Sequence, residues 1–134
     1  MKIEFFSQSG FVTLVSTLIV GAVGLAITVS VIMLGLASSR TSFAGQQSTQ
    51  ARLLADACAE EGLQQIRDLT AYTGTGSLTI GSGTCTYTVA SQGGENRTVS
   101  ASGVVGTVTR RVVVTLTAIN PSLTVSSWQE VGNF

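Results

Sequence analysis

Histidine is absent from the chain of 134 residues, and charged side chains make up only 10% of it, against roughly 25% in an average soluble domain. Without histidine, the chain lacks the commonest general base and the commonest metal ligand. Seven basic and seven acidic residues give a formal net charge of zero, and the arginines are scattered apart from Arg110-Arg111. We therefore expect no metal site, no cofactor and no specific nucleic-acid partner. The arginine pair is too small a patch to indicate nucleic-acid binding, and DNA uptake and a subunit contact both remain open as its use.

The remaining residues that often carry chemistry lack the partners they would need. Glu60-Glu61 is the adjacent acid pair, but neighbours in a helix point about 100° apart and do not converge on one substrate. Cys58 has no histidine to activate it. The glycine clusters 74–76 and 81–83 lack the lysine of a phosphate-binding loop. We expect no catalytic residues and no enzymatic activity.

Charge is also missing from one long stretch, which runs from Phe5 to Ser39. Its apolar part, Phe11–Ala37, exceeds the roughly 20 residues that a membrane-spanning helix needs. The apolar residues are distributed all round the helix, which predicts burial in lipid or in a helical bundle. A secretory signal peptide cleaved near 42–44 is disfavoured, because the apolar run is too long and Arg40 precedes the small residues.

Downstream of this run, the pattern changes to that of an amphipathic helix. Residues 38–52 are polar and contain no proline, so they can continue the helix, with Gly45 expected to bend or loosen it locally. Over 51–69, apolar residues recur at helical spacing, with Asp56, Glu60, Gln64 and Asp68 on the polar face. One face of this segment is expected to pack on another part of the protein.

The C-terminal half is typical of an antiparallel sheet. Residues 73–76 (TGTG) are expected to break the structure, residues 92–96 to form a turn, and Gly106 another turn. Between them, strands are predicted over 77–80, 84–90, 97–105 and 107–119, with an edge strand near 123–127. Residues 84–90 alternate cleanly, which predicts one buried and one solvent-exposed face. Trp128 is interpreted as a packing residue.

The helix stripe and the apolar sheet face each need a partner, so packing one on the other is the economical arrangement. Cys58 lies on the stripe and Cys85 on the apolar face. A Cys58–Cys85 disulfide would join helix to sheet if the domain is extracytoplasmic; two unpaired buried thiols are the alternative. The expected fold class is α+β.

A short polar leader, Gly10-Phe11, a long helix that turns amphipathic and a terminal sheet together resemble a type IV pilin or pseudopilin. The opening Phe11-Val12-Thr13-Leu14 resembles that family's FTLIE. The resemblance implies a pilin-like fold in which one helix, about 11–70, packs its C-terminal half on a sheet of four to five strands. It implies a leader at 1–10, a membrane or filament-core helix at 11–38, an amphipathic continuation at 39–72 and a sheet domain at 73–134.

The sequence departs from the family at the fifth mature position, where Val15 stands in place of the usual glutamate. In the family, that acid is thought to pair with the N-terminal amine of a neighbouring subunit. A buried ammonium without a partner is costly, and no acid follows Phe11 until Asp56. The amine would have to use Thr13 or Ser16, stay hydrated, or belong to a subunit at the filament tip.

By resemblance, we expect processing after Gly10 by a prepilin peptidase and N-methylation of Phe11. The expected function is a structural subunit that sits in the cytoplasmic membrane as a single-pass protein. It then polymerises through its helix into an extracellular filament with the pilus assembly machinery. The alternatives are a minor pseudopilin of a type II secretion or competence machine, and a membrane-tethered binding module using the Thr/Ser face or loop 91–96. The sequon at Asn96 is expected to be unmodified.

Overall fold

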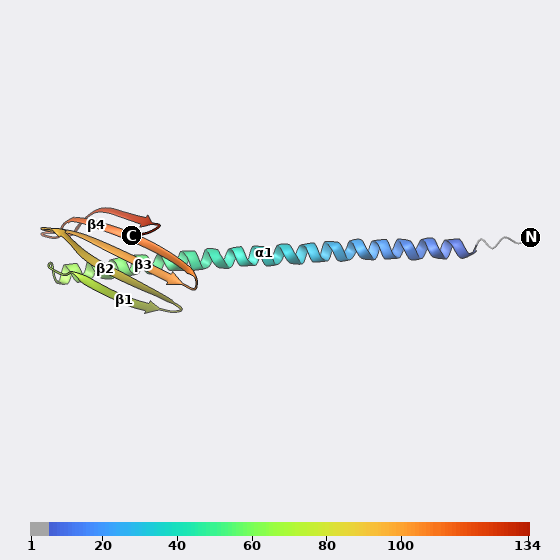
Figure 1. Cartoon of the computed structure of the whole chain (residues 1–134), viewed down its shortest axis with the longest axis horizontal. Helices are drawn as coiled ribbons and strands as arrows, with labels where there is room; N and C mark the ends of the chain where they lie inside the picture. Colours follow the sequence, from blue (N-terminus) through green and yellow to red (C-terminus); the bar gives the residue numbers. More distant parts are fainter. Residues whose placement is uncertain (1–5) are drawn as a thin grey trace, which may run out of the picture. The chain divides into compact units, whose positions relative to one another are not determined.

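The structure, a computed structural model, describes the chain from residue 6 to residue 134, and its side chains from Gly10 onward. In this part of the chain, one helix, α1 (Phe6–Asp68), precedes five strands (Figure 1). The strands are β1 (Gly74–Ile80), β2 (Gly83–Gly93), β3 (Asn96–Val105), β4 (Val108–Ala118) and β5 (Thr124–Val131). The chain forms two compact units with a boundary between Ser42 and Phe43. The predicted α+β class is confirmed.

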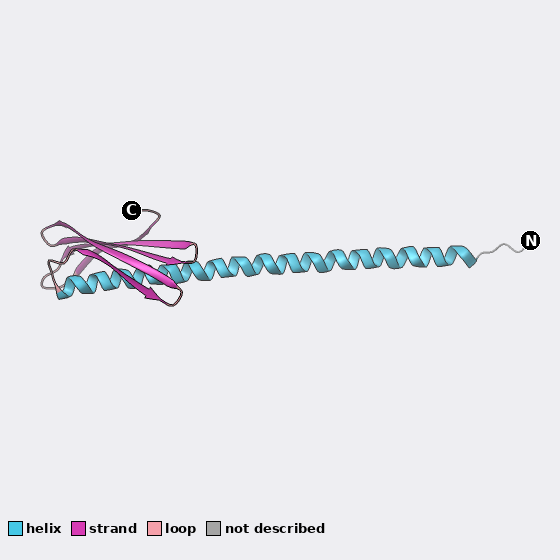
Figure 2. Cartoon of the chain, turned by 60° about the horizontal axis from the view of Figure 1, so that its bottom comes forward, coloured by secondary structure: helices cyan, strands magenta, loops and turns pink. Residues whose placement is uncertain are grey.

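The second unit is a helix packed on a sheet, as predicted (Figure 2). Its sheet is a simple antiparallel meander in the order β1-β2-β3-β4-β5. Residues of α1 at helical spacing are fully or almost fully buried against it: Ala51, Leu54, Ala55, Cys58, Ala59, Leu63 and Ile66. Alternate residues of the strands supply the other half of the core: Cys85, Tyr87, Val89, Val99, Ala101, Val105, Val112, Val114 and Leu116. The pleat thus turns one face of the sheet toward the helix.

The opposite face of the sheet is rich in hydroxyl groups. Thr84, Thr86 and Thr88 of β2 are exposed, and they pair with Thr79, Ser77 and Thr75 of β1. The alternating residues of β2 therefore place an apolar face inward and a threonine face outward, as predicted.

The turns between the first four strands are tight, and their geometry requires glycine at particular positions. Ile80 pairs with Gly83 and Val105 pairs with Val108, so each of these two hairpins has a two-residue loop. The first loop residue is Gly81 in one and Gly106 in the other, with φ of 61° and 59°. Residues other than glycine rarely adopt a positive φ. A positive φ at this position is typical of two-residue hairpin loops.

The expectation that residues 73–76 break the structure was wrong, because Gly74 begins β1. Gly76 pairs with Tyr87, and a Cβ atom at Gly76 would collide with the Tyr87 ring. The glycine therefore makes room for a buried aromatic side chain from the neighbouring strand. Composition alone does not separate this use of glycine from a loop.

The last strand is longer than predicted, extending to Val131. Its pairing with β4 is irregular between Thr115 and Ala118. Such irregularities interrupt the alternation by which a strand is recognised. Trp128 lies in this strand and retains 42% exposure, so it sits at the margin of the core.

Candidate functional site

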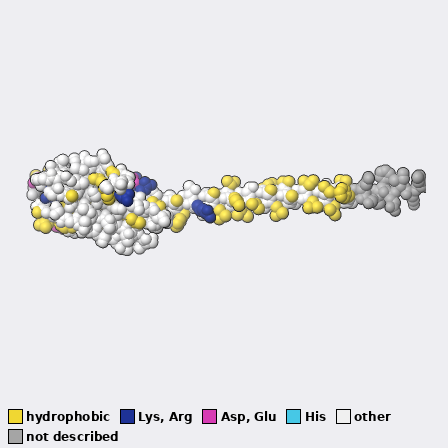
Figure 3. Space-filling view, viewed as in Figure 1, with side chains coloured by type: hydrophobic (Ala, Val, Ile, Leu, Met, Phe, Trp, Pro, Cys, Tyr) yellow, Lys and Arg dark blue, Asp and Glu magenta, His cyan; other side chains and the backbone are white. Residues whose placement is uncertain are grey.

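The N-terminal part of α1 exposes an apolar surface that no other part of the described chain covers. From Phe11 to Leu36, large hydrophobic side chains are exposed on every side of the helix, with Phe11 at 70% and Leu34 at 71%. Figure 3 shows hydrophobic side chains along the visible face of this segment. Exposed apolar surface of this extent marks contact with lipid or with other protein. We call Phe11–Ala37 the apolar segment.

Several hydroxyl side chains within the apolar segment donate to the backbone of their own helix. The hydroxyls of Thr17 and Thr28 donate to the carbonyl oxygens three residues earlier, at 2.9 and 2.8 Å, and Ser30 donates to the oxygen of Ala26 at 2.7 Å. In a dry environment, an unsatisfied hydroxyl costs several kcal/mol. The segment is therefore compatible with lipid or a helical core. By length and composition, it is able to span a membrane.

The predicted processing junction, Gly10-Phe11, lies inside α1 and is exposed at both residues. The carbonyl oxygen of Gly10 accepts the hydroxyl of Thr13 at 2.9 Å. The first five residues of the expected leader lie outside the described residues. Val15 is half-buried by its helical neighbours and brings no charge to this end of the helix.

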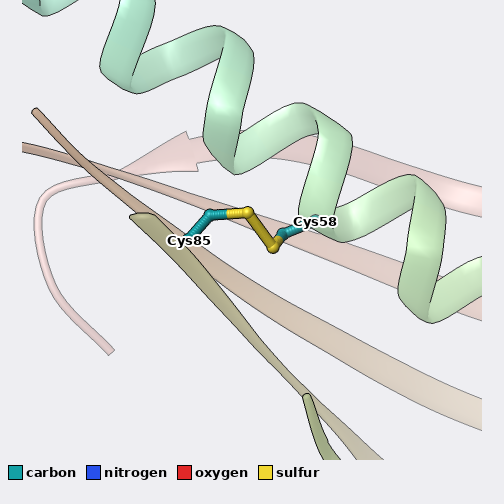
Figure 4. The surroundings of a disulfide bond; sticks show 2 residues. All are labelled: Cys58 and Cys85. Atoms are coloured by element: carbon teal, nitrogen blue, oxygen red, sulfur yellow. A yellow bond between two sulfur atoms is a disulfide. The ribbon is translucent and has the colours of Figure 1, made fainter. Parts of the chain in front are cut away.

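The predicted disulfide is present and joins the helix to the sheet (Figure 4). The Cα atoms of Cys58 and Cys85 lie 6.0 Å apart, within the range that unstrained disulfides use. Both side chains are buried, with 0% and 1% exposure. The bond therefore lies in the core, at the contact between α1 and β2.

In the described part of the chain, one charged residue is buried, Arg97, with 7% exposure. It was not singled out from the sequence. Its Nη1 donates to the carbonyl oxygens of Gly94 and Asn96 and to the Ser91 hydroxyl, at 2.8, 3.0 and 3.2 Å. Its Nη2 donates to the carbonyl oxygen of Thr70 at 3.1 Å. The guanidinium thus joins the β2–β3 turn to the chain just beyond the helix, where carbonyls lack helical partners.

A set of polar side chains connects α1 to β4 and β5 along one flank of the helix. We call this set the polar rim: Ser48, Arg52, Asp56, Arg110, Trp128 and Glu130. Arg110 donates from Nε to Ser48 at 3.0 Å and pairs through Nη1 with Glu130 at 2.9 Å. The Trp128 indole N–H donates to Asp56 at 3.3 Å. Arg110, considered above for a subunit contact, is thus used within the chain.

In the described part of the chain, the environment of Tyr87 clearly raises the pKa of its phenol. Burial raises the pKa of Tyr87 to about 12, and the hydrogen bond with Tyr72 and the charges of Tyr72 and Glu61 act in the same direction. Its ring lies against Gly62 and Gly76. A phenol that stays protonated in a packed core stabilises structure and offers no reactive oxygen at neutral pH.

The other candidate groups are dispersed. The Glu61 carboxylate accepts from Gln65 on its own helix at 3.0 Å. Between Gly10 and Phe134, no three side chains of histidine, cysteine, aspartate or glutamate come together as metal ligands. Asn96 of the sequon is exposed in the β2–β3 turn.

No family model, curated protein or solved structure matches this chain. The fold itself, one long N-terminal helix packed on a five-stranded antiparallel sheet, is consistent with a pilin-like arrangement.

Proposed function

We propose that this chain is a structural subunit of a type IV pilus-like filament, anchored in a membrane by the apolar segment before assembly. In this proposal, cleavage after Gly10 makes Phe11 the mature N-terminus. The helix then leaves the bilayer and packs with the helices of other copies, while the sheet domain faces outward.

The apolar segment is the observation that carries the proposal. It is exposed on all sides and continues as the helix that forms half of the sheet domain's core. The hydroxyls of Thr17, Thr28 and Ser30 donate to carbonyl oxygens of the same helix. Lipid and a helical bundle are both dry and both require an internally satisfied backbone, so the same segment suits the two stages.

Val15 favours a second candidate, a minor pseudopilin located at a filament tip. A tip subunit has no neighbour beyond it, so the amine of Phe11 would not need a buried carboxylate. Negative-stain microscopy of cells carrying this protein separates the two candidates. With an antibody label against this protein, long fibres labelled along their length support the main subunit. Label confined to the fibre ends supports the minor subunit.

The mature N-terminus is the decisive test of processing. Intact-mass and N-terminal peptide spectrometry on protein from its own membranes should find a chain beginning at Phe11 with a methylated amine. Gly10→Val should leave the leader attached, whereas the matched substitution Gly21→Val should not affect cleavage. A native chain that begins at Met1 or at Gly45 would refute the proposal.

A further inference from the structure

The part of α1 that packs on the sheet has two flanks, and the side chains beside them differ in polarity. The flank facing β4 and β5 carries the polar rim, where Arg110, Glu130 and Trp128 contact Ser48, Arg52 and Asp56 of α1, respectively. The flank facing β1 is open. There, a cavity of about 390 Å³ lies between α1 and the β1–β2 hairpin. β1 and β5 are the two edges of the sheet (Figure 1).

This cavity, the β1-side groove, is mostly apolar. Leu53, Leu54 and Ala57 line it from the helix, and Ile80, Gly83 and Val105 line it from the sheet. None of its lining residues is charged. Leu53 is 63% exposed and Ile80 is 53% exposed, so both retain large apolar surfaces outside the core.

Exposed leucine and isoleucine side chains beside an uncharged groove indicate a surface that another molecule covers. One further large apolar side chain is exposed on this side of the helix toward the N-terminus. Phe43, seven residues before Gln50 of the groove, is 61% exposed. Residues seven apart lie on nearly the same side of an α-helix.

We propose that the β1-side groove receives the apolar segment of a second copy of this chain. The inference rests on the proposed filament function and names the contact that would hold neighbouring copies. The apolar segment is a long exposed surface of the described chain, and it carries no charge. The groove also has an uncharged lining, so the two surfaces match. A groove that binds a different surface of the next copy makes a head-to-tail contact, which builds a filament when the rotation between copies does not close into a ring.

Site-specific photo-cross-linking in the full-length protein tests the contact. A benzophenone amino acid at position 53 or 80, irradiated in native membranes or filaments, should give a dimer whose cross-linked peptide lies within 11–37 of the second copy. The same probe at Thr86, on the hydroxyl face, should give no cross-link to that segment. A probe at Leu25 verifies that copies are within reach of each other.

Cross-links only to lipid, to a different protein, or to another region of a second copy would overturn the inference. So would the absence of cross-links from both groove positions while the probe at Leu25 joins copies. If fibres form and start at Phe11 yet the groove positions miss the segment, the inference fails and the proposed function stands. If the native chain starts at Met1, the proposed function fails on its own test.

A paired substitution gives an independent readout. Leu53→Gln combined with Ile80→Gln removes apolar surface that is exposed in the single chain, so the sheet domain should still fold. We expect at least a tenfold loss of assembled protein, with unchanged Trp128 fluorescence as evidence of folding. Thr79→Gln combined with Thr84→Gln, on the hydroxyl face, is the matched control. Equal assembly by the two pairs would contradict the inference.

Discussion

The contact between helix and β3 at Gly103 offers the sharpest test of the packing described above. A Cβ atom at this position would collide with the carbonyl oxygen of Ala51 and lie 2.6 Å from the amide nitrogen of Ala55. These two backbone atoms are hydrogen-bond partners in a regular α-helix. Neither can rotate away, so Gly103→Ala would force the helix off the sheet or bend the strand.

The expected cost follows from two opposing effects. Overpacking a core typically costs 1–3 kcal/mol, and a collision with the backbone belongs at the upper end of that range. Replacing glycine by alanine also lowers the conformational entropy of the unfolded chain, which stabilises the folded state by about 0.4–1 kcal/mol. We therefore expect Gly103→Ala to lower the free energy of unfolding by about 2 kcal/mol. For a domain of this size, the melting temperature would fall by roughly 8–16 °C.

The assay is thermal unfolding of the full-length protein in mild detergent, followed by tryptophan fluorescence. Trp128 is the single tryptophan of the chain, and its indole contacts Asp56 of the helix. It therefore reports directly on separation of helix and sheet. The matched control is Gly132→Ala, because a Cβ atom there meets no other heavy atom within 4 Å.

The control should change stability by less than about 0.5 kcal/mol, as substitutions away from packed regions usually do. A Gly103→Ala variant that melts within 2 °C of the wild type would refute the close approach of β3 to the helix backbone.

Three further predictions concern the same domain. Replacing both Cys58 and Cys85 by serine opens a crosslink of sequence separation 27 and should lower the free energy of unfolding by about 3–4 kcal/mol; a loss under 1 kcal/mol in urea unfolding would contradict this. Because unfolded tyrosine loses its proton near pH 10 while folded Tyr87 keeps it to about 12, stability should fall by about 2–3 kcal/mol as the pH rises through this interval. Tyr87→Phe should flatten that fall in alkaline melting curves. Arg97→Met should cost about 2 kcal/mol, and Arg97→Lys should not restore it, because one ammonium cannot reach carbonyls on both sides of the guanidinium; full recovery by lysine in the same melting assay would contradict that role.

Much of this architecture follows from short-range patterns in the sequence. An uncharged run of apolar residues has few alternatives to a helix in a dry environment. The alternation around Tyr87 and the helical spacing around Cys58 each identify a buried face before any contact is known. Two faces that each need covering, with one cysteine on each, then predict the packing and the disulfide, both of which are present.

Features that depend on contacts between distant residues were not predictable in this way. The glycine-rich run at Gly74 and Gly76 resembles a loop in composition, and its place in β1 depends on the ring of Tyr87 from the next strand. Arg97 resembles a surface residue until the end of the helix is brought against the β2–β3 turn. In both, the deciding partner is remote in sequence, so no local pattern indicates it.

The sequence by itself therefore determined the membrane-compatible helix, the two amphipathic surfaces and the pair of cysteines, because hydrophobic burial depends on periodicity within each element. Only the tertiary structure decided which flank of the helix is closed by the polar rim and which is left as an apolar groove. That difference depends on how far β1 and β5 reach around the helix and which side chains they bring to it, and no single element carries this information.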